Sequence, residues 1–367
     1  MLPVSRPALP PLSAFAELLE DIWSSRMLSN FGKYARRLEE QAQADLRNPF
    51  VRALVSGDIG LVLSLASLGL PEGGECLVQS FTFNSTVNAI LWNRLRPVFV
   101  DIDPRTLNVD TADLERRVSP ATRAIVVTHI FGSPLDLDRV LGLARARGIP
   151  VVVDAAHGYG AEYRGMRIGD PRLGDYQVFS LSGTKQVTSA EGGLVAAANA
   201  GLAGRIEFRR AYGFQNDYVS RALGLNGKIS EIHAALGCLT LGEADRVVAE
   251  RAKKAERYRA RLGSVPGLAF QEHLAGCRSA YKDFAILCPE RRDALAEQLA
   301  TDGIQTKTYF RPLHAMPLFE PFRGRGDDLA DTEAVAARVL CLPMFNELSD
   351  ADIDRVSERV ARFYGRG

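Results

Sequence analysis

The stretch from Ile149 to Val195 limits most strongly what this chain can fold into. It opens with a valine-rich apolar run, Ile149 to Val153, that ends on Asp154. Short apolar runs bounded by turn residues are typical of buried strands. Ligands in open α/β sheets bind at the carboxyl ends of the strands, so Asp154 is expected to face a ligand.

Lys185 follows a second short apolar run, Tyr176 to Leu181, and lies among small residues. A lysine with its ordinary pKa of ~10.4 is a poor nucleophile until burial or a nearby cation lowers that pKa. In a pyridoxal 5'-phosphate (PLP) site such a lysine forms a Schiff base, and an upstream acid keeps the pyridine nitrogen protonated. A lone aspartate is more often a helix cap and a lone lysine more often solvated surface, but the pair in this order is more specific.

Three motifs give the chain a resemblance to a known family. They read Asp154-Ala-Ala-His157, Phe179-Ser-Leu-Ser-Gly-Thr-Lys185 and Glu191-Gly-Gly. On these residues the sequence resembles the DegT-type (DegT/StrS) nucleotide-sugar aminotransferases, which are PLP enzymes of fold type I. The resemblance extends over nearly the whole chain, from Arg6-Pro7 to Leu342-Pro343.

The resemblance implies an α/β protein with an aspartate aminotransferase-like large domain and a mostly parallel sheet over residues 1–245. A smaller C-terminal α+β domain is expected over 246–367, entered through a long charged helix from Arg246 to Leu262. Within it we expect strands and helices to alternate through Ala280 to Leu287, Arg292 to Asp302, Gln305 to Thr308 and Asp350 to Tyr364. A polar loop is expected at 323–328.

The family assigns a cofactor site in which Lys185 and Asp154 are the catalytic residues. Lys185 forms the Schiff base and moves protons, and Asp154 pairs with the pyridinium. The turn from Ser56 to Gly60 opens a helix whose N–H groups attract a phosphate, but Asp58 stands where the family has a hydroxyl residue, and its carboxylate repels phosphate. The predicted cofactor-binding residues are Gly57, Asp58, Ile59, Phe83 stacking on the ring, Asp154, His157 near O3′, Ser180 at the phosphate, Lys185, and Asn226 reaching the partner's cofactor.

The resemblance also implies two substrates, glutamate as the amino donor and a nucleotide-linked keto sugar as the acceptor. Lys228, Tyr309 and His314 are the predicted substrate-binding residues, in a homodimer with shared active sites. The chain most resembles enzymes that aminate C4 of dTDP-4-keto-6-deoxyglucose, although the sequence does not name the sugar, the nucleotide or the carbon. Two alternatives stay open: a PLP-dependent sugar dehydratase of the same fold, and a non-catalytic regulatory protein.

Composition excludes several other classes. The chain has 367 residues with 45 basic and 44 acidic side chains, a net charge of +1 that indicates neither nucleic-acid nor membrane-surface binding. Its five cysteines are scattered without a CxxC pair, which favours reduced thiols over disulfides or a zinc site. Asp103-Pro-Arg is expected to form a turn, so Asp101 and Asp103 are not predicted to bind a metal. No apolar run approaches the ~18 residues of a membrane span, and a cytoplasmic location is expected.

Overall fold

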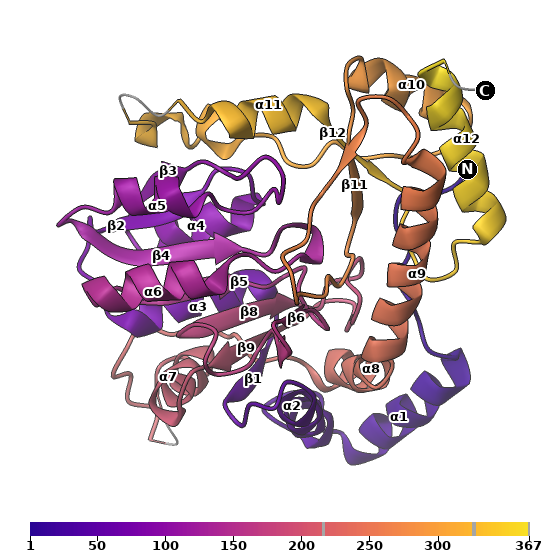
Figure 1. Cartoon of the computed structure of the whole chain (residues 1–367). Coiled ribbons are helices and arrows are strands. Elements are labelled where there is room, and N and C mark those ends of the chain that lie inside the picture. The colour runs from indigo at the N-terminus through magenta and orange to yellow at the C-terminus, as the bar shows by residue number, and fades with distance from the viewer. Residues whose placement is uncertain (215–216, 325–327, 366–367) are drawn as a thin grey trace.

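The molecule is built on a seven-stranded sheet with the order β1-β9-β8-β5-β4-β2-β3 (Figure 1). This computed structural model describes residues 1–214, 217–324 and 328–365, so residues 325–327 of the predicted polar loop lie outside the described residues. Strands β8, β5, β4, β2 and β3 run parallel, whereas β9 pairs antiparallel with both β8 and β1. The predicted mostly parallel α/β fold is therefore confirmed.

Strands and helices alternate from β1 to β5, the part of the chain that forms most of the parallel sheet. The strands are β1 Val51–Leu54, β2 Glu75–Gln79, β3 Arg96–Val100, β4 Thr122–Thr128, β5 Val151–Asp154, β6 Glu162–Tyr163, β7 Met166–Arg167, β8 Tyr176–Ser180, β9 Gly193–Ala197, β10 Ala269–Phe270, β11 Phe284–Leu287 and β12 Val339–Leu342. The helices are α1 Leu12–Ser25, α2 Lys33–Asp45, α3 Gly57–Leu68, α4 Asn84–Trp92, α5 Thr111–Arg117, α6 Leu137–Arg147, α7 Ala200–Arg210, α8 Glu231–Leu241, α9 Ala244–Leu262, α10 Arg292–Thr301, α11 Ala330–Arg338 and α12 Asp350–Phe363, with short 3₁₀ turns η1 Ile130–Gly132, η2 Leu313–Ala315 and η3 Glu320–Phe322. None of these described helices is long and apolar enough to cross a membrane.

Helices cover both faces of the large sheet, and β5 shows why its sequence is apolar throughout. Successive side chains of a strand point to opposite faces. Val151 and Val153 pack into one core together with α6 and α8, whereas Val152 packs into the other core with α3 and α4. A strand buried on both faces needs an unbroken apolar run. The first polar side chain, Asp154, therefore comes only where the strand ends.

Helix α9 joins the two lobes of the molecule. Ala244 and Val248 near its start belong to the core of the large lobe, whereas Tyr258 and Leu262 near its end belong to the C-terminal core. The expected charged bridging helix is present. The expected domain boundary at 245/246 falls inside this continuous helix and stays a prediction.

The C-terminal lobe contains a three-stranded antiparallel sheet, β10-β11-β12, with α9, α10 and α12. Two strand predictions were too long. Residues 280–283 are not in the sheet, because the amides of Ala280 and Lys282 donate instead to the carbonyls of Gly132 and Phe131 in the large lobe, each at 2.9 Å. The segment 305–308 forms one isolated bridge, between Lys307 and Cys341. The extreme N-terminus also lies on this lobe, where Leu2 pairs with Ile304.

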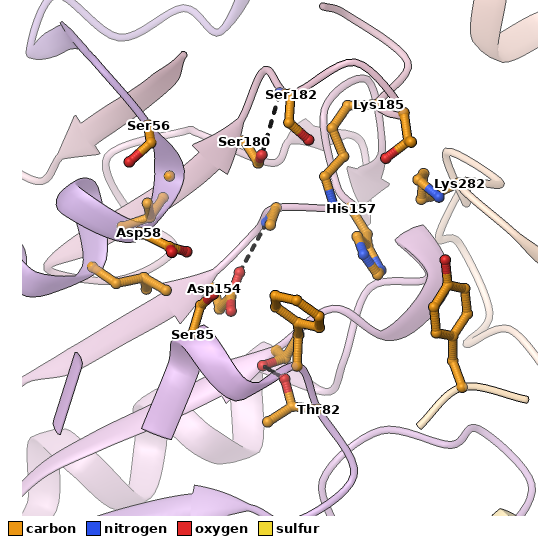
Figure 2. Close-up of a pocket in the computed structure, with 18 of the residues that line it drawn as sticks. Ser56, Asp58, Thr82, Ser85, Asp154, His157, Ser180, Ser182, Lys185 and Lys282 are labelled. Atoms are coloured by element: carbon orange, nitrogen blue, oxygen red, sulfur yellow. Dashed lines mark hydrogen bonds between the residues drawn. The ribbon is translucent and has the colours of Figure 1, made fainter. Parts of the chain in front are cut away.

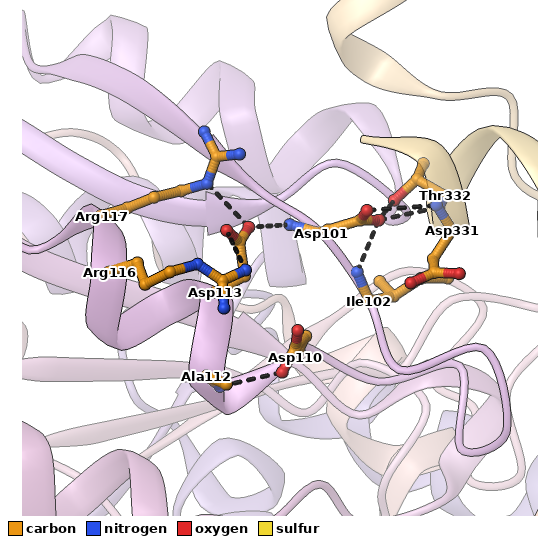
Figure 3. A network of polar contacts seen from close by, with 9 residues as sticks. All are labelled: Asp101, Ile102, Asp110, Ala112, Asp113, Arg116, Arg117, Asp331 and Thr332. Carbon is orange, nitrogen blue, oxygen red and sulfur yellow. Dashed lines mark hydrogen bonds and ion pairs between the residues drawn. The ribbon is translucent and has the colours of Figure 1, made fainter. Parts of the chain in front are cut away.

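Asp101 attaches α11 to the large lobe (Figure 3). It follows β3, and its carboxylate accepts hydrogen bonds from the amide of Asp331 at 3.1 Å and from the amide and hydroxyl of Thr332 at 2.8 and 2.7 Å. These amides lie in the first turn of α11, which has no side-chain cap of its own. Asp103 accepts from the amide of Arg105 at 2.8 Å, so the predicted turn is present.

Candidate active site

A cavity of about 350 Å³ lies at the carboxyl ends of β4, β5 and β8 (Figure 2). This volume falls within the range of roughly 300–1,000 Å³ that is usual for small-molecule sites. The first turns of α3 and α4 form its floor, and the C-terminal lobe contributes Lys282, Lys307, Tyr309 and Phe310 to its wall. The cavity is therefore shared between the two lobes, at the edge where the sheet topology places ligands.

Lys185 extends into this cavity from the loop between β8 and β9. Burial and, to a lesser extent, the charge of Lys282 together lower the pKa of its amino group to about 8, although Asp283, Asp154 and Asp58 oppose that change. About a tenth of the amine is therefore unprotonated at pH 7, far more than for a lysine with its ordinary pKa. This is the condition under which a lysine acts as a nucleophile.

Asp154 is buried, and two donors fix its carboxylate. Thr86 donates its hydroxyl to Oδ2 at 2.7 Å, and the amide of Ala156 donates to Oδ1 at 3.0 Å. Thr86 is itself in contact with Thr82, at 3.1 Å between the hydroxyl oxygens. Burial raises the pKa of Asp154, whereas the two hydrogen bonds and the charge of Lys185 lower it. A carboxylate held in this way is aimed at a cationic partner in the cavity.

The first turn of α3 approaches the end of β8 closely enough to require glycine. A Cβ on Gly57 would lie 3.1 Å from the Cβ of Ser180, and a Cβ on Gly193 would lie 2.6 Å from the nitrogen of Gly57. The first amides of a helix have no intrahelical acceptor, so those of Gly57 and Asp58 are suited to bind an anion. The amide of Ile59 already donates to the Ser56 hydroxyl at 3.2 Å, which disfavours its predicted contact with a phosphate.

Phe83 and His157 provide the aromatic walls. Phe83 precedes α4 and is 56% exposed although it lines the cavity, so it is not an ordinary core phenylalanine. His157 is buried and stacks on Phe310, with ring centroids 6.1 Å apart and an interplanar angle of 19°. Burial, followed by the charges of Lys185 and Lys282, lowers its pKa well below the ordinary value, so the imidazole is neutral. Its Nδ1 has no partner among the described residues.

Four predicted residues do not line this cavity: Ile59, Asn226, Lys228 and His314. Asn226 is exposed, and its Oδ1 accepts from Lys228 Nζ at 2.6 Å. This surface position fits a reach toward a second subunit but makes no contact in the cavity of its own chain. His314 is fully buried, with Nδ1 2.7 Å from the Ser80 hydroxyl and Nε2 3.0 Å from Glu333, which favours a structural role over substrate contact.

Sequence reasoning missed Thr86 and Lys282. Thr86 belongs to the polar run Thr82-Phe-Asn-Ser-Thr86, whose hydroxyls gave no signal of an aspartate far along the chain. Lys282 has a detectable signature, because Lys282-Asp283 is a charged doublet directly before an apolar strand run. Charged residues are almost never fully buried unless paired, so such a doublet suggests a buried ion pair.

The residues that line the cavity supply the groups that a PLP site needs: the Asp154 carboxylate, the Phe83 ring, the helix N-terminal amides of α3 and the Lys185 amine. Asp58 also lines the cavity, and its carboxylate is unfavourable for a phosphate at this helix N-terminus. The unpartnered Nδ1 of His157 is suited to a polar ring substituent. Among the described residues no group of three or more His, Cys, Asp or Glu side chains is arranged for a metal ion.

Comparison with known proteins agrees with this geometry. The model of the DegT/DnrJ/EryC1/StrS aminotransferase family matches residues 13–361. A dTDP-4-amino-4,6-dideoxy-D-glucose transaminase from Escherichia coli is 30% identical over 363 residues, 97% of each chain. A pleiotropic regulatory protein from Geobacillus stearothermophilus is 31% identical, over 93% of this chain and 91% of its own. The crystal structure of DesI, determined in the presence of its TDP-sugar product, has a TM-score of 0.93 and 32% identity, covering 100% of this chain and 93% of DesI. The predicted fold type and aminotransferase class are confirmed, and the chain belongs to the DegT/DnrJ/EryC1/StrS aminotransferase family.

Proposed function

We propose that the protein uses PLP to transfer an amino group from glutamate to a nucleotide-linked keto sugar. One observation carries this proposal: the Lys185 amine and the fixed Asp154 carboxylate lie in one cavity beside the exposed ring of Phe83. The bound cofactor supplies an electron sink for the electrons released when a proton leaves the substrate carbon.

The residues that surround the cofactor have separate roles. Lys185 holds the cofactor and then moves a proton as a free amine, which its pKa of about 8 permits near neutral pH. Asp154 holds a proton on the ring nitrogen, because its carboxylate is fixed by Thr86 and needs a positive partner. The neutral His157 orients the ring without adding a charge. The amides at the start of α3 and the Ser180 hydroxyl bind the phosphate.

The nucleotide sugar is the proposed acceptor because of the relatives' printed names, which include a dTDP-4-amino-4,6-dideoxy-D-glucose transaminase. A dTDP-4-keto-6-deoxyhexose aminated at C4 is therefore the first substrate to test. Tyr309 at the cavity wall is the proposed sugar contact. The exposed Asn226 and the half-buried Lys228 support a homodimer in which each chain completes the other's site.

Two other functions make different predictions. A dehydratase of this fold replaces the lysine by histidine or uses an iron–sulfur cluster, whereas Lys185 is present here and the cysteines are scattered. A regulatory protein that kept the fold would not need a reactive lysine, and a relative named as a pleiotropic regulatory protein keeps this possibility testable.

The deciding experiment is incubation with PLP, glutamate and a panel of nucleotide keto sugars, followed by mass spectrometry. Replacement of a ketone by an amine raises the sugar mass by about one unit and supports aminotransfer, whereas loss of water indicates a dehydratase. Lys185→Ala is the control that should abolish the reaction while leaving the circular dichroism spectrum unchanged. If no panel member reacts with the intact protein, the proposed function is wrong.

A further inference from the structure

Lys282 is a buried cation that the proposed roles above leave unused. Its side chain is 3% exposed, yet it lines the cavity near Lys185 (Figure 2). The main chain around it is fixed to the large lobe, because its amide donates to the Phe131 carbonyl and that of Ala280 donates to the Gly132 carbonyl. The C-terminal lobe thus presents an ammonium group at a defined point beside the reactive amine.

The hydrogen bonds of this ammonium group are incomplete. Lys282 Nζ donates to Asp283 Oδ1 at 3.0 Å, which is the only acceptor that the described residues provide for it. An ammonium group has three N–H donors. Burying such a group costs several kcal/mol unless its donors are satisfied. The remaining donors of Lys282 are therefore available to an acceptor inside the cavity.

An anionic group of a substrate is the acceptor that such a site favours. No arginine is among the described residues that line the cavity, and the cations there are Lys185, Lys282 and Lys307. Lys185 is assigned to the cofactor, and Lys307 Nζ donates to the Tyr309 hydroxyl at 2.9 Å. Lys282 is the remaining cation close to the reacting centre, since its charge acts on both Lys185 and His157.

Both proposed substrates bear an anion, but at different distances from the reacting carbon. The α-carboxylate of an amino acid is bonded directly to the carbon that loses its amine. The diphosphate of a nucleotide sugar lies on the far side of the sugar ring from C4. We propose, resting on the proposed function, that Lys282 binds the α-carboxylate of the amino donor and so selects α-amino acids in the first half of the reaction.

Two half-reactions separate this role from binding of the sugar diphosphate. Glutamate and the amino-sugar product each convert the PLP form of the enzyme to its amine form, with the same change in absorbance. We expect Lys282→Gln to raise the KM for glutamate by about ten- to a hundred-fold, as for the loss of a hydrogen bond to a charged group. The KM for the amino sugar should change less than about three-fold, within the scatter of unrelated substitutions.

A binding measurement removes the dependence on turnover. Calorimetric titration of the PLP-loaded protein should show α-methyl-glutamate, which has no α-hydrogen, binding more tightly than 4-aminobutanoate, which has no α-carboxylate. Lys282→Gln should remove most of that difference, whereas Lys282→Arg, which keeps the charge, should retain it. Lys253→Gln, on the exposed face of α9, is the matched surface control.

Each result decides the matter. If only the KM for the amino sugar rises, Lys282 binds the diphosphate instead. If both KM values rise equally, or neither rises, Lys282 has a structural role. Each of these three results overturns the inference. The inference also fails if Lys282→Arg folds but loses the preference for α-methyl-glutamate. If the unmodified enzyme is converted by neither substrate, the proposed function itself is wrong, which is a distinct outcome.

Discussion

Thr86→Val tests whether the orientation and charge of Asp154 depend on the hydroxyl found by the structure. Valine has nearly the shape of threonine, so the main change is the loss of the 2.7 Å hydrogen bond to Asp154 Oδ2. The amide of Ala156 remains as a donor to the other oxygen. The substitution therefore weakens the support of the carboxylate without removing the carboxylate.

The size of the effect follows from the charge on the acceptor. A hydrogen bond to a charged group contributes about 1.5–3 kcal/mol, and about 1.4 kcal/mol corresponds to one pKa unit. Burial already raises the pKa of Asp154, and the hydrogen bond from Thr86 opposes that rise, so loss of this bond should raise the pKa further. The free energy of the bond corresponds to about a ten- to hundred-fold change in the ratio of carboxylate to carboxylic acid. Asp154 would then be ionised only at higher pH, so the activity of the variant should fall most at the acid end of the pH profile.

The assay is the pH dependence of kcat/KM for glutamate, with the bound PLP content measured in parallel. We expect the acid limb for Thr86→Val to move upward by about one to two units, and Thr86→Ser, which restores the hydroxyl, to move it back. An unchanged acid limb in Thr86→Val with full PLP content would refute the reasoning. A Thr86→Ser variant as impaired as valine would show that shape, not the hydrogen bond, matters.

Four further predictions follow from the same structure. Borohydride should fix a pyridoxyl group on Lys185, and recovery of the label on another lysine would contradict its assignment. Because the pKa of Lys185 is about 8, its free-amine fraction grows with pH, so PLP uptake by the cofactor-free protein should speed up about ten-fold between pH 7 and 9, as followed by absorbance. Lys185→Ala and Asn226→Ala chains should partly restore activity when mixed, since one site of a mixed dimer is intact; mixed dimers without activity would refute shared sites. Asp101→Ala should lower the free energy of unfolding by about 0.5–2 kcal/mol in urea denaturation, as for loss of a helix cap, whereas Asp101→Asn should keep most of it.

Local chain geometry explains which features could be predicted from the sequence. Asp154 and Lys185 both follow apolar strands. A strand that is buried on both faces must be apolar along its whole length, so its first polar residue marks the end of the strand. Gly57 and Gly193 belong to short motifs in which any side chain would collide with the neighbouring backbone or side chain. These constraints act within a few residues of the motif, so they leave a mark in the sequence.

Features that depend on contacts across the chain were not predictable in this way. Thr86 reaches Asp154 across 68 residues. His314 is predicted to bind substrate, but it is buried against Ser80 and lies outside the cavity, which no local pattern reveals. The strand expected from Ala280 stops short because its amides find acceptors in η1 of the large lobe. In each case a partner far along the chain decides the outcome.

That same exchange of hydrogen bonds links the fold to the chemistry. If residues 280–283 were part of β11, their amides would pair within the C-terminal sheet. The two lobes would then lack the hydrogen bonds that these amides now form between them. Instead the amides of Ala280 and Lys282 bond to Gly132 and Phe131, and the side chain of Lys282 enters the cavity between the lobes. The proposed cofactor-binding residues all come from the large lobe. The cation proposed to select the amino donor comes from the C-terminal lobe, so under this proposal the selection would depend on the hydrogen bonds that join the two lobes.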